Sequence, residues 1–512
     1  MKFISGIFSI LLIAIFVTTA NAKAQVEDGV DIRKVQRILT TLCYKPGPID
    51  GLWGRRTANA VTEFLADEKK EYDGNLNRSE AEFIFARAAV INGLGKSKKC
   101  KSAASQQNNK PSSAVTIFPN QIKLPDHLKS QPNDATINYY IQYQDRWMRQ
   151  QPFHKIYPAK QPRKITSSLE KHAFAQKSLR DSSLLSYLYM ENGVLVYDEL
   201  PPKDRFKTDV DFNTYLPSHS MGKSIVSYLI GHAICQGYIE SIEAPLNDWK
   251  AIQSTLYFDQ PLINLLNMRA GDAQIIDQYG GNFRNSGRSI FDTPLILAVN
   301  NERELKNTKP ISNAKFSYSN LNSNILANYL MFKVGDDFDT FMQNFYEQKI
   351  KNRHPIYHMR TPTSNGLKSA SISKRIQDLT ARYDFWATRY DYLRIAMSLM
   401  EDWQNETCEG KYLRELYKHK VRTNRRQASW RDHDFGGGKA AFIDAASRYA
   451  GQFWTDFKEL RGKVVLGMTG YNGQQIIMDM DTSRIVVLNA ALSNHYDTYK
   501  LGLEPLKYGR IR

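Results

Sequence analysis

Ser220 and Lys223 stand three residues apart in the stretch from Pro217 to Val226, and this pair could carry nucleophilic chemistry. A serine hydroxyl becomes a strong nucleophile only when a base takes its proton. A lysine can be that base when burial lowers the pKa of its ammonium group toward neutrality. If a helix starts at Ser220, the spacing stacks Lys223 one turn above the hydroxyl on the same face. The pair therefore predicts a serine nucleophile with a lysine base.

The residues after Ser220 favour such a helix, because apolar side chains recur at helical spacing as far as Gly237, which can end it. These are Met221, Ile225, Val226, Leu229, Ile230, Ala233 and Ile234. The N–H groups at the start of a helix could also stabilise an oxyanion. The same Ser-x-x-Lys spacing occurs at Ser168/Lys171, Ser312/Lys315 and Ser371/Lys374, but no long apolar helix follows those serines. The context, not the spacing alone, singles out Ser220.

Two later segments carry further groups that such a site needs. Tyr318 follows Lys315 by three residues, and a nearby lysine can lower the pKa of a phenol toward that of a useful base. Asn320 offers both a hydrogen-bond donor and an acceptor. Residues 467–474 read Gly-Met-Thr-Gly-Tyr-Asn-Gly-Gln, whose glycines would let the backbone approach a substrate closely.

Strands must position these groups. Residues 185–190 and 194–197 have strand composition and flank Glu191-Asn192-Gly193, a hairpin signal. Further strand patterns lie at 451–455, 464–470, 475–478 and 485–489, and residues from about 220 to 445 read as mostly helical. Strands at both ends of a helical middle predict an α+β fold with an antiparallel sheet built from distant parts of the chain.

Residues 30–95 read as a separate three-helix unit. Apolar stripes at 32–42 and 58–65 predict two helices, and Ser79-Glu80-Ala81-Glu82 predicts a capping box that opens a third. The loop between the first two helices is rich in Pro and Gly, which impose a fixed turn, and Thr57 can cap the second helix.

This unit resembles the peptidoglycan-binding domain of cell-wall enzymes. The matching residues are Val35-Gln36-Leu39, the Gly47/Asp50-Gly51/Gly54 loop, Thr57, Ala60-Val61 and Phe64. The resemblance implies that the unit holds the protein on cell-wall glycan or peptide, with Asp50 and Trp53 as candidate contacts. Trp53 could equally fill the small core, and the module could bind nothing or only the larger domain.

The segments around Ser220, Tyr318 and Thr469 together resemble the serine β-lactamase and penicillin-binding-protein superfamily. They are most similar to its class C-like esterase and amidase branch, which includes hydrolases of short nylon oligomers. Leu265-Leu266-Asn267-Met268-Arg269-Ala270-Gly271 and Phe385-Trp386-Ala387-Thr388 add to the resemblance, which covers about residues 180–495. It implies a β-lactamase-like antiparallel sheet flanked by helices, together with a helical subdomain.

By this resemblance Ser220 would be the acylated nucleophile, and Lys223 and Tyr318 would share its proton and then activate the deacylating water. Asn320 would orient the substrate or Lys223. The N–H groups of Ser220 and Tyr471 would form the oxyanion hole, and Thr469 and Gly470 would line the substrate site.

Met468 departs from the family pattern. Members that recognise penicillin carry Lys or His there, and that cation meets the carboxylate of a penicillin or of a D-alanyl terminus. A thioether cannot replace it, so Met468, in the substrate-binding segment, favours an ester or amide that lacks this carboxylate. Arg461 or Lys463 could compensate.

The chain of 512 residues begins with a secretory signal pattern at 1–22: Lys2, an apolar run at 7–17 and Ala20-Asn21-Ala22. An uncleaved anchor is the alternative. After cleavage no stretch is long and apolar enough to span a bilayer. We expect a periplasmic or secreted bacterial protein with a binding unit at 30–95, a polar linker at 96–135 and a hydrolase domain at 136–512.

Four cysteines remain after residue 22, and in an exported chain they allow three pairings. Cys43–Cys100 is the favoured pair because both flank the small unit, whereas Cys235 could be a buried thiol. The sequence contains no Cys-x-x-Cys pair, the pattern that would suggest structural zinc. His354 and His358 have the spacing of metal ligands, but no third ligand is evident. We expect neither a metal nor another cofactor.

The net charge of +17 suits attraction to anionic polymers or membranes, or a basic surface that keeps the protein soluble. The chain has no recognisable nucleic-acid-binding motif. The sequence thus predicts an exported serine hydrolase of a small ester, amide or peptide, with cell-wall polymer as its partner. The alternatives are a catalytically inactive wall-binding protein and a D,D-peptidase or β-lactamase.

Overall fold

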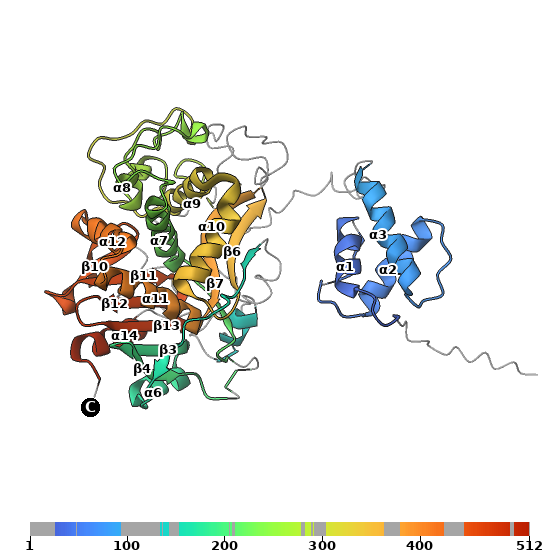
Figure 1. Ribbon diagram of the computed structural model, residues 1–512, viewed down its shortest axis with the longest axis horizontal. Coiled ribbons are helices and arrows are strands. Elements are labelled where there is room, and N and C mark those ends of the chain that lie inside the picture. The colour runs from blue at the N-terminus through green and yellow to red at the C-terminus, as the bar shows by residue number, and fades with distance from the viewer. Residues whose placement is uncertain are drawn as a thin grey trace, which may run out of the picture. The chain divides into compact units, whose positions relative to one another are not determined.

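The computed structural model divides the chain into two compact units, Met1–Ala114 and Val115–Arg512 (Figure 1). It describes residues 26–42, 44–47, 49–93, 134–135, 137–142, 153–203, 205–206, 210–277, 282–287, 290, 304–362, 379–423, 445–491 and 496–510. The predicted signal segment 1–22 and most of the predicted linker lie outside these residues. Among the described helices, none has the length and apolar character needed to cross a bilayer.

The first unit contains three helices, α1 (Ile32–Thr41), α2 (Arg55–Asp67) and α3 (Arg78–Gly93). Their apolar faces meet in a small core that includes Val35, Leu39, Val61, Phe64 and Ile84, each fully buried. Burial of an amphipathic face, more than intrinsic propensity, stabilises helices of this length. The predicted three-helix unit is therefore confirmed.

Two predicted caps of these helices are wrong by a few residues. At α3 the reciprocal bonds join Asn77 and Glu80, because the N–H of Asn77 donates to Glu80 Oε2 (3.0 Å) and the N–H of Glu80 donates to Asn77 Oδ1 (2.9 Å). Ser79 therefore lies inside the helix. Thr57 lies inside α2, which begins after Gly54. The Thr57 hydroxyl is buried and donates to the carbonyl of Pro46 (3.0 Å).

A nine-stranded sheet forms the centre of the second unit, in the order β2-β4-β3-β13-β12-β11-β10-β9-β8. Its strands are β2 (Thr166–Ser167), β3 (Leu184–Glu191), β4 (Val194–Glu199), β8 (Val421–Arg422), β9 (Ala446–Ala450), β10 (Phe453–Phe457), β11 (Val465–Gly470), β12 (Gln474–Asp479) and β13 (Arg484–Ala490). Every neighbouring pair is antiparallel except β2–β4. The predicted α+β fold class is confirmed, including the β3–β4 hairpin, whose turn residues Asn192 and Gly193 both have positive φ.

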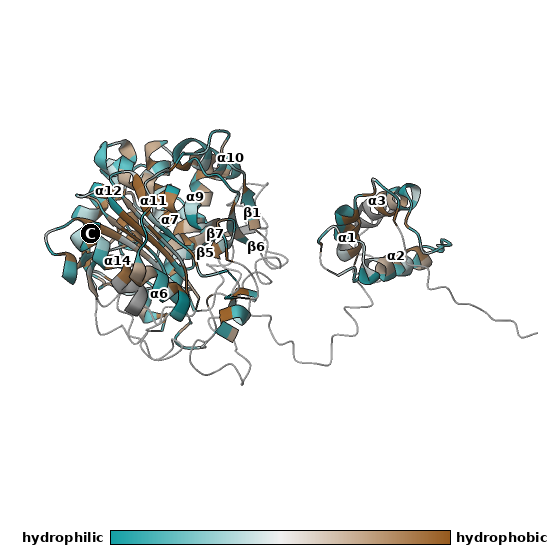
Figure 2. Ribbon diagram, turned by 90° about the horizontal axis from the view of Figure 1, so that it is seen from below, coloured by the Kyte–Doolittle hydropathy of each residue, from teal (hydrophilic) through white to brown (hydrophobic). Residues whose placement is uncertain are grey.

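Helices cover both faces of this sheet. On one face lie α7 (Met221–Cys235) and α11 (Arg389–Gln404), and on the other lie α6 (Ala173–Asp181) and α14 (Tyr496–Tyr508). Figure 2 shows hydrophobic residues concentrated in the strands between these two layers. Strands buried on both faces read as almost continuous apolar runs, as in β12 and β13.

Further helices pack beside α7: α8 (Leu262–Leu266), α9 (Asn320–Val334), α10 (Phe338–Asn344) and α12 (Cys408–Lys418). Short 3₁₀ segments lie at Lys250–Ile252, Asp272–Gln274, Gly335–Asp337, Lys458–Leu460 and Tyr471–Gly473, and a π-helical turn lies at Phe345–Ile350.

A second sheet corrects the prediction that residues 220–445 are mostly helical. It has the order β1-β6-β7-β5, built from β1 (Phe153–Ile156), β5 (Tyr215–Pro217), β6 (Ile356–Pro362) and β7 (Leu379–Thr388). Two of these strands lie within the stretch expected to be helical. The last residues of β7, 385–388, are those that added to the family resemblance. They lie beside β5, the strand that leads to Ser220.

One disulfide lies within the described residues, and it joins the two cysteines that the favoured Cys43–Cys100 pairing leaves over. Cys235, at the end of α7, forms a disulfide with Cys408, the first residue of α12, across 173 positions of sequence. Cys235 is therefore not a lone buried thiol. Cys43 and Cys100 lie outside the described residues.

Candidate active site

The turn before α7 presents Ser220 at the N-terminal end of the helix. Ser218 is held to β7, since its N–H donates to the carbonyl of Phe385 (2.7 Å) and its hydroxyl accepts from the N–H of Phe385 (2.9 Å). His219 then adopts a φ of 45°, a region that non-glycine residues rarely occupy. Such local strain is stored where the surrounding structure fixes it. Here it orients Ser220, the N-cap residue of α7.

Gly222 allows the helix to start this close to β7. A Cβ atom at this position would lie 1.7 Å from the carbonyl oxygen of Tyr383, a distance that no side chain can tolerate. Any larger residue would push the first turn of α7 away from β7. Gly222 therefore fixes the position of Ser220 relative to Tyr383.

Ser220, Lys223 and Asn320 form one hydrogen-bonded group. Lys223 Nζ lies 2.8 Å from Ser220 Oγ and donates to Asn320 Oδ1 over 2.8 Å. Lys223 and Asn320 are buried, whereas Ser220 is partly exposed. The nucleophile residue is therefore partly open to solvent, whereas the amine beside it is buried.

The environment of Lys223 favours its neutral form. Burial lowers the pKa of Lys223 well below its usual range, and the only opposing cause is the charge of Asp384. Its hydrogen-bond partners, a hydroxyl and an amide oxygen, carry no compensating negative charge. In the opposite direction, Nζ lies 3.6 Å from the ring centroid of Tyr383 and 5.0 Å from that of Tyr318, and such ring faces attract an ammonium group. A neutral amine has a lone pair that can accept the proton of Ser220.

Tyr318 lies at the same place, but its electrostatics correct the prediction. Burial raises the pKa of Tyr318, although a hydrogen bond with Ser220 acts in the opposite direction. The expectation that a lysine would lower this pKa is wrong, because burial is the largest influence on the phenol and no lysine is among its causes. The Tyr318 ring stacks on Trp454 of β10 with 5.9 Å between centroids. Tyr318 can therefore donate a proton more readily than accept one.

Tyr383 is a member of this group that the sequence did not reveal. Its hydroxyl donates to Asn320 Oδ1 (2.9 Å), and a hydrogen bond with Ser220 contributes to its pKa. Asp384 follows it, and burial raises the pKa of the Asp384 carboxyl to about 7 against the lowering effects of Lys223 and Arg382. Both residues lie about 160 positions after Ser220 on a strand that was not expected, so no local pattern could have indicated them.

The loop before α9 is tied to Met268 and Asp272. The N–H of Ser317 donates to the carbonyl of Met268 (2.9 Å), and the Ser319 hydroxyl donates to Asp272 Oδ2 (2.5 Å). Ser319 also caps α9 by accepting from the N–H of Asn322. These bonds fix the start of α9, where Asn320 faces Lys223.

The end of β11 lies against the Ser218–His219 turn. A Cβ atom at Gly470 would lie 2.3 Å from the carbonyl oxygen of Ser218, so glycine permits this approach. Within the described residues β10 pairs with β11 only at Trp454 and Gly467. The last residues of β11 therefore run beyond β10 toward Ser220. Thr469 and Gly470 are both buried, and Tyr471 is partly exposed.

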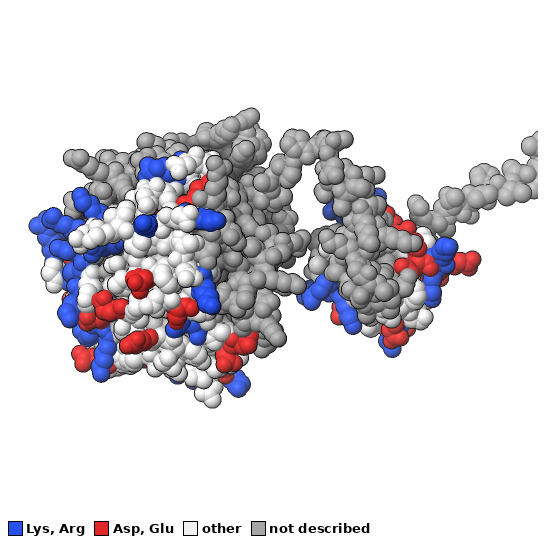
Figure 3. Space-filling model, turned by 90° about the horizontal axis from the view of Figure 1, so that it is seen from above, with Lys and Arg blue, Asp and Glu red and all other residues white. Residues whose placement is uncertain are grey.

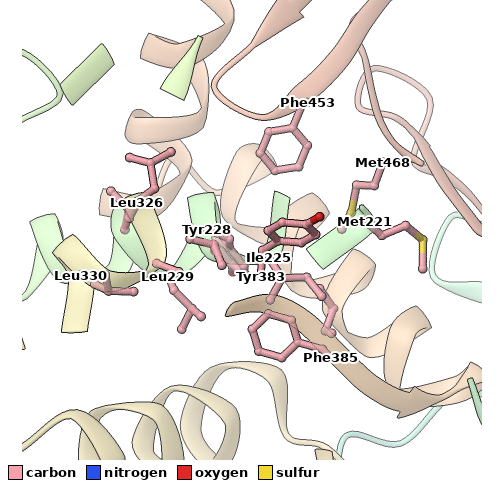
Figure 4. Packing of buried hydrophobic residues seen from close by; sticks show 14 of the residues in the cluster. Met221, Ile225, Tyr228, Leu229, Leu326, Leu330, Tyr383, Phe385, Phe453 and Met468 are labelled. Atoms are coloured by element: carbon pink, nitrogen blue, oxygen red, sulfur yellow. The ribbon is translucent and has the colours of Figure 1, made fainter. Parts of the chain in front are cut away.

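Met468 points into the core. It is fully buried, and Figure 4 places its side chain beside Met221 and below Phe453 in the main apolar cluster. Its side chain therefore has no exposed surface in this structure, and its place among the substrate-binding residues stays a prediction. The candidate substitute Lys463 is also engaged elsewhere, because its Nζ donates to Asp479 (2.7 Å) and to the carbonyl of Leu506 (2.8 Å).

Two backbone N–H groups were predicted to form an oxyanion hole. In the Ser220 turn the N–H groups of Met221, Gly222 and Lys223 bond to the carbonyls of Ser218, His219 and Ser220 respectively. No described group accepts the N–H of Ser220, so this donor is available. Tyr471 opens a 3₁₀ turn whose next residue, Asn472, donates to the Tyr140 hydroxyl, which lies 3.2 Å from His219 Nε2.

In the first unit, the two predicted wall contacts are both partly exposed and have different partners. The Asp50 carboxylate accepts from Gln36 Nε2 and from the N–H of Leu52, each at 2.9 Å, which organises the loop. Trp53 is partly buried against the three-helix core, while neighbouring Leu52 is 70% exposed. Wall contact by Asp50 or Trp53 remains a prediction.

Comparison with known proteins gives separate findings for the two units. Residues 28–82 match the family model described as "Putative peptidoglycan binding domain". No curated protein matches the chain.

The chain is similar to several solved structures, of which three are described here. A "Putative 6-aminohexanoate-dimer hydrolase from Bacillus anthracis" is 15% identical, with a TM-score of 0.47, over 74% of this chain and 96% of that chain. A penicillin-binding protein homologue from Pyrococcus abyssi is 15% identical, with a TM-score of 0.42, over 65% and 74%. FmtA from Staphylococcus aureus is 14% identical, with a TM-score of 0.41, over 77% and 97%. The family match at residues 28–82 confirms the resemblance of the first unit to peptidoglycan-binding domains.

Proposed function

We propose that the protein is a serine hydrolase that cleaves an ester or amide through an acyl-enzyme on Ser220. The observation that carries this proposal is the 2.8 Å separation between Ser220 Oγ and the buried Nζ of Lys223. Burial lowers the pKa of Lys223, which favours the neutral amine that can act as a base.

In the acylation step, Lys223 Nζ takes the hydroxyl proton as Ser220 Oγ forms a bond to the substrate carbonyl carbon. The carbonyl oxygen gains negative charge, and the N–H of Ser220 and the N–H of Tyr471 would stabilise it. The bond to the leaving group then breaks, and that group takes a proton. Tyr318 is suited to supply it, because its raised pKa keeps the phenol protonated and it is hydrogen-bonded to Ser220. Lys223 returns its proton to the phenolate.

In the deacylation step a water molecule replaces the leaving group. Lys223 takes a proton from this water, the resulting hydroxide attacks the acyl carbon, and Ser220 leaves with a proton. Asn320 positions Lys223 throughout, since Asn320 Oδ1 accepts from both Nζ and the Tyr383 hydroxyl. The cycle consumes only water and needs no cofactor.

The substrate class follows from the charges around the site. Met468 is an uncharged, buried side chain, and Lys463 is held by Asp479. Neither supplies a cation for a substrate carboxylate, which disfavours efficient action on penicillins or on D-alanyl termini. An ester or amide with an uncharged group at this position fits better.

The match of residues 28–82 supports a place outside the cytoplasm, at the bacterial cell wall. We propose that the first unit binds a wall polymer and keeps the hydrolase near it. Sedimentation with purified wall material would test this, by comparing the full chain with a version that lacks residues 30–95. Co-sedimentation that survives the deletion would remove the assigned role.

The decisive test of the chemistry is covalent labelling by a fluorophosphonate, together with hydrolysis of a short-chain chromogenic ester. Ser220→Ala is expected to abolish both. Ser312→Ala is the matched control, because Ser312 belongs to another Ser-x-x-Lys sequence and is exposed. Equal turnover by wild type and Ser220→Ala would end the proposal. A wild type that shows neither labelling nor turnover would instead indicate an inactive wall-binding protein.

A further inference from the structure

A cavity of about 650 Å³ opens in the second unit away from Ser220. Its walls come from β2, β4, the start of α11 and the segments just before β5 and β6. None of the residues that surround Ser220 lines it. In the main sheet β4 and β11 are separated by β3, β13 and β12, which corresponds to roughly 19 Å at the usual strand spacing. The cavity is therefore a separate site.

Basic side chains dominate the polar part of this cavity. Arg163, Lys164, Arg353 and Arg394 line it, and Asp198 is the only carboxylate among the lining residues. On the face of the second unit drawn in Figure 3, the described Lys and Arg lie among Asp and Glu. Among the lining residues of the cavity, four cations face one carboxylate.

The ion pairs around the cavity leave two of its cations unpaired. Arg163 pairs with Glu401 (2.8 Å), and Arg394, whose side chain is 4% exposed, pairs with Asp391 (3.0 Å). Asp198 pairs with Arg389 (2.7 Å), which lies outside the lining. Lys164 and Arg353 have no carboxylate partner among the described residues, and both are exposed at the cavity wall.

An apolar surface adjoins these cations. Phe212 is 54% exposed although it is a large hydrophobic residue, and it lines the cavity together with Ile165 and Leu195. Ligand sites typically combine such an apolar wall with a few convergent polar groups, in volumes of about 300–1,000 Å³. Lysine and arginine together favour phosphate and carboxylate groups, and an arginine can bind either through two parallel N–H donors.

We propose that this cavity binds a small organic anion, with a phosphate or carboxylate group between Lys164 and Arg353 and an apolar body against Phe212. The buried Arg394 supports the floor, and its ion pair with Asp391 fixes its position. This proposal does not depend on hydrolysis at Ser220.

Calorimetric titration of the full chain with phenyl phosphate tests the proposal. Benzoate, titrated in parallel, shows whether the cavity prefers a carboxylate or a phosphate. Inorganic phosphate, which has no apolar body, shows how much the aromatic ring contributes to the affinity. Benzyl alcohol is the uncharged control. We expect saturable binding of at least one of the two aromatic anions and none of benzyl alcohol at equal concentration.

The variants distinguish binding in this cavity from non-specific attraction to a positively charged protein and from binding at the Ser220 site. Lys164→Gln with Arg353→Gln is expected to weaken binding at least tenfold, and Phe212→Ala several-fold. Lys160→Gln with Lys418→Gln removes the same charge from side chains that are 89% and 74% exposed and lie outside the cavity. This control and Ser220→Ala should bind within twofold of wild type.

The proposal is overturned if wild type shows no saturable binding of either aromatic anion. It is equally overturned if the Lys164/Arg353 variant binds as wild type does, or if benzyl alcohol binds as well as the anions. Ligand-induced shifts in Tm, measured for each variant, show whether the protein is folded. If the double variant does not fold, Phe212→Ala and the decrease of affinity with added salt decide the question.

Discussion

Each end of α7 lies beside a lysine amine, and the two amines have opposite electrostatic settings. At its start, Lys223 contacts a hydroxyl and an amide oxygen, and burial lowers its pKa. At its end, His232 lies 2.7 Å from Glu409, and Lys349 approaches Asp402 and Glu409 to 2.7 and 2.9 Å. Although burial acts in the other direction, the hydrogen bonds from His232 and Lys349 lower the pKa of Glu409 to about 2.

The difference shows that the partners of a buried amine decide what it can do. Lys349 has two carboxylates that stabilise its charge, so it serves as part of a structural ion-pair group. Lys223 has only uncharged hydrogen-bond partners, and its neutral amine can accept a proton. The disulfide between Cys235 and Cys408 further fixes the structural end of α7. The same helix therefore has a reactive start and a tightly held end.

The largest effect is expected when the reactive amine is removed. Lys223→Met should lower kcat/KM for a chromogenic ester about 10³-fold, within the usual range for loss of a general base. Thermal stability should be unchanged or higher, because methionine fills the space without the cost of burying an amine. Parallel measurement of kcat/KM and Tm checks both parts. A large fall in Tm would show that Lys223 stabilises the fold as Lys349 does.

Removing the disulfide should affect stability and leave the chemistry intact. Cys235→Ser with Cys408→Ser should lower the free energy of unfolding by about 4 kcal/mol, because the bond closes a loop of 173 residues in the unfolded chain. Denaturant unfolding measures this change. At temperatures where the variant is folded, kcat/KM should stay within about threefold of wild type; a much lower value would show that the end of α7 also controls its start.

The matched substitution at the structural end should reverse the pattern seen for Lys223. Lys349→Met leaves the buried carboxylates of Asp402 and Glu409 without their cation. The expected loss is about 3 kcal/mol of unfolding free energy, at the lower end for a broken buried pair because Lys349 is 19% exposed. The change in kcat/KM should be small. Urea titrations of this variant and of Lys223→Met, compared side by side, provide the measurement, and equal losses would contradict the comparison.

The smallest effect concerns the pH dependence of the reactive end. Asp384 is the group whose charge raises the pKa of Lys223, against the larger lowering by burial. Asp384→Asn removes this charge, so the pKa of Lys223 should fall further and the neutral base should persist to lower pH. The acid limb of the profile of kcat/KM against pH should therefore move to lower pH.

Asp336→Asn, at an exposed position, is the control for this pH measurement. Tyr318, Tyr383 and His219 also face Lys223, but their pKa values are shifted toward the uncharged forms. An acid limb that moves to higher pH would show that Asp384 does not act through Lys223.

The sequence by itself determined the features that depend on local spacing. The stacking of Lys223 on Ser220 follows from the helical period, and the β3–β4 hairpin follows from Asn192 and Gly193 at its turn. The three-helix unit follows from its apolar stripes. Each of these is fixed by residues fewer than about twenty positions apart, so the pattern is visible without the fold.

Only the tertiary structure decided the features that join distant segments. The contact of Tyr383 with Asn320, the pairing of Cys235 with Cys408 and the burial of Met468 against Met221 each connect residues more than sixty positions apart. The direction of the Tyr318 pKa shift also depends on the tertiary structure, because burial raises this pKa and the lysine nearest in sequence does not control it. Spacing along the chain fixes which side chains share a face, whereas packing fixes which groups they meet and how far they are removed from water.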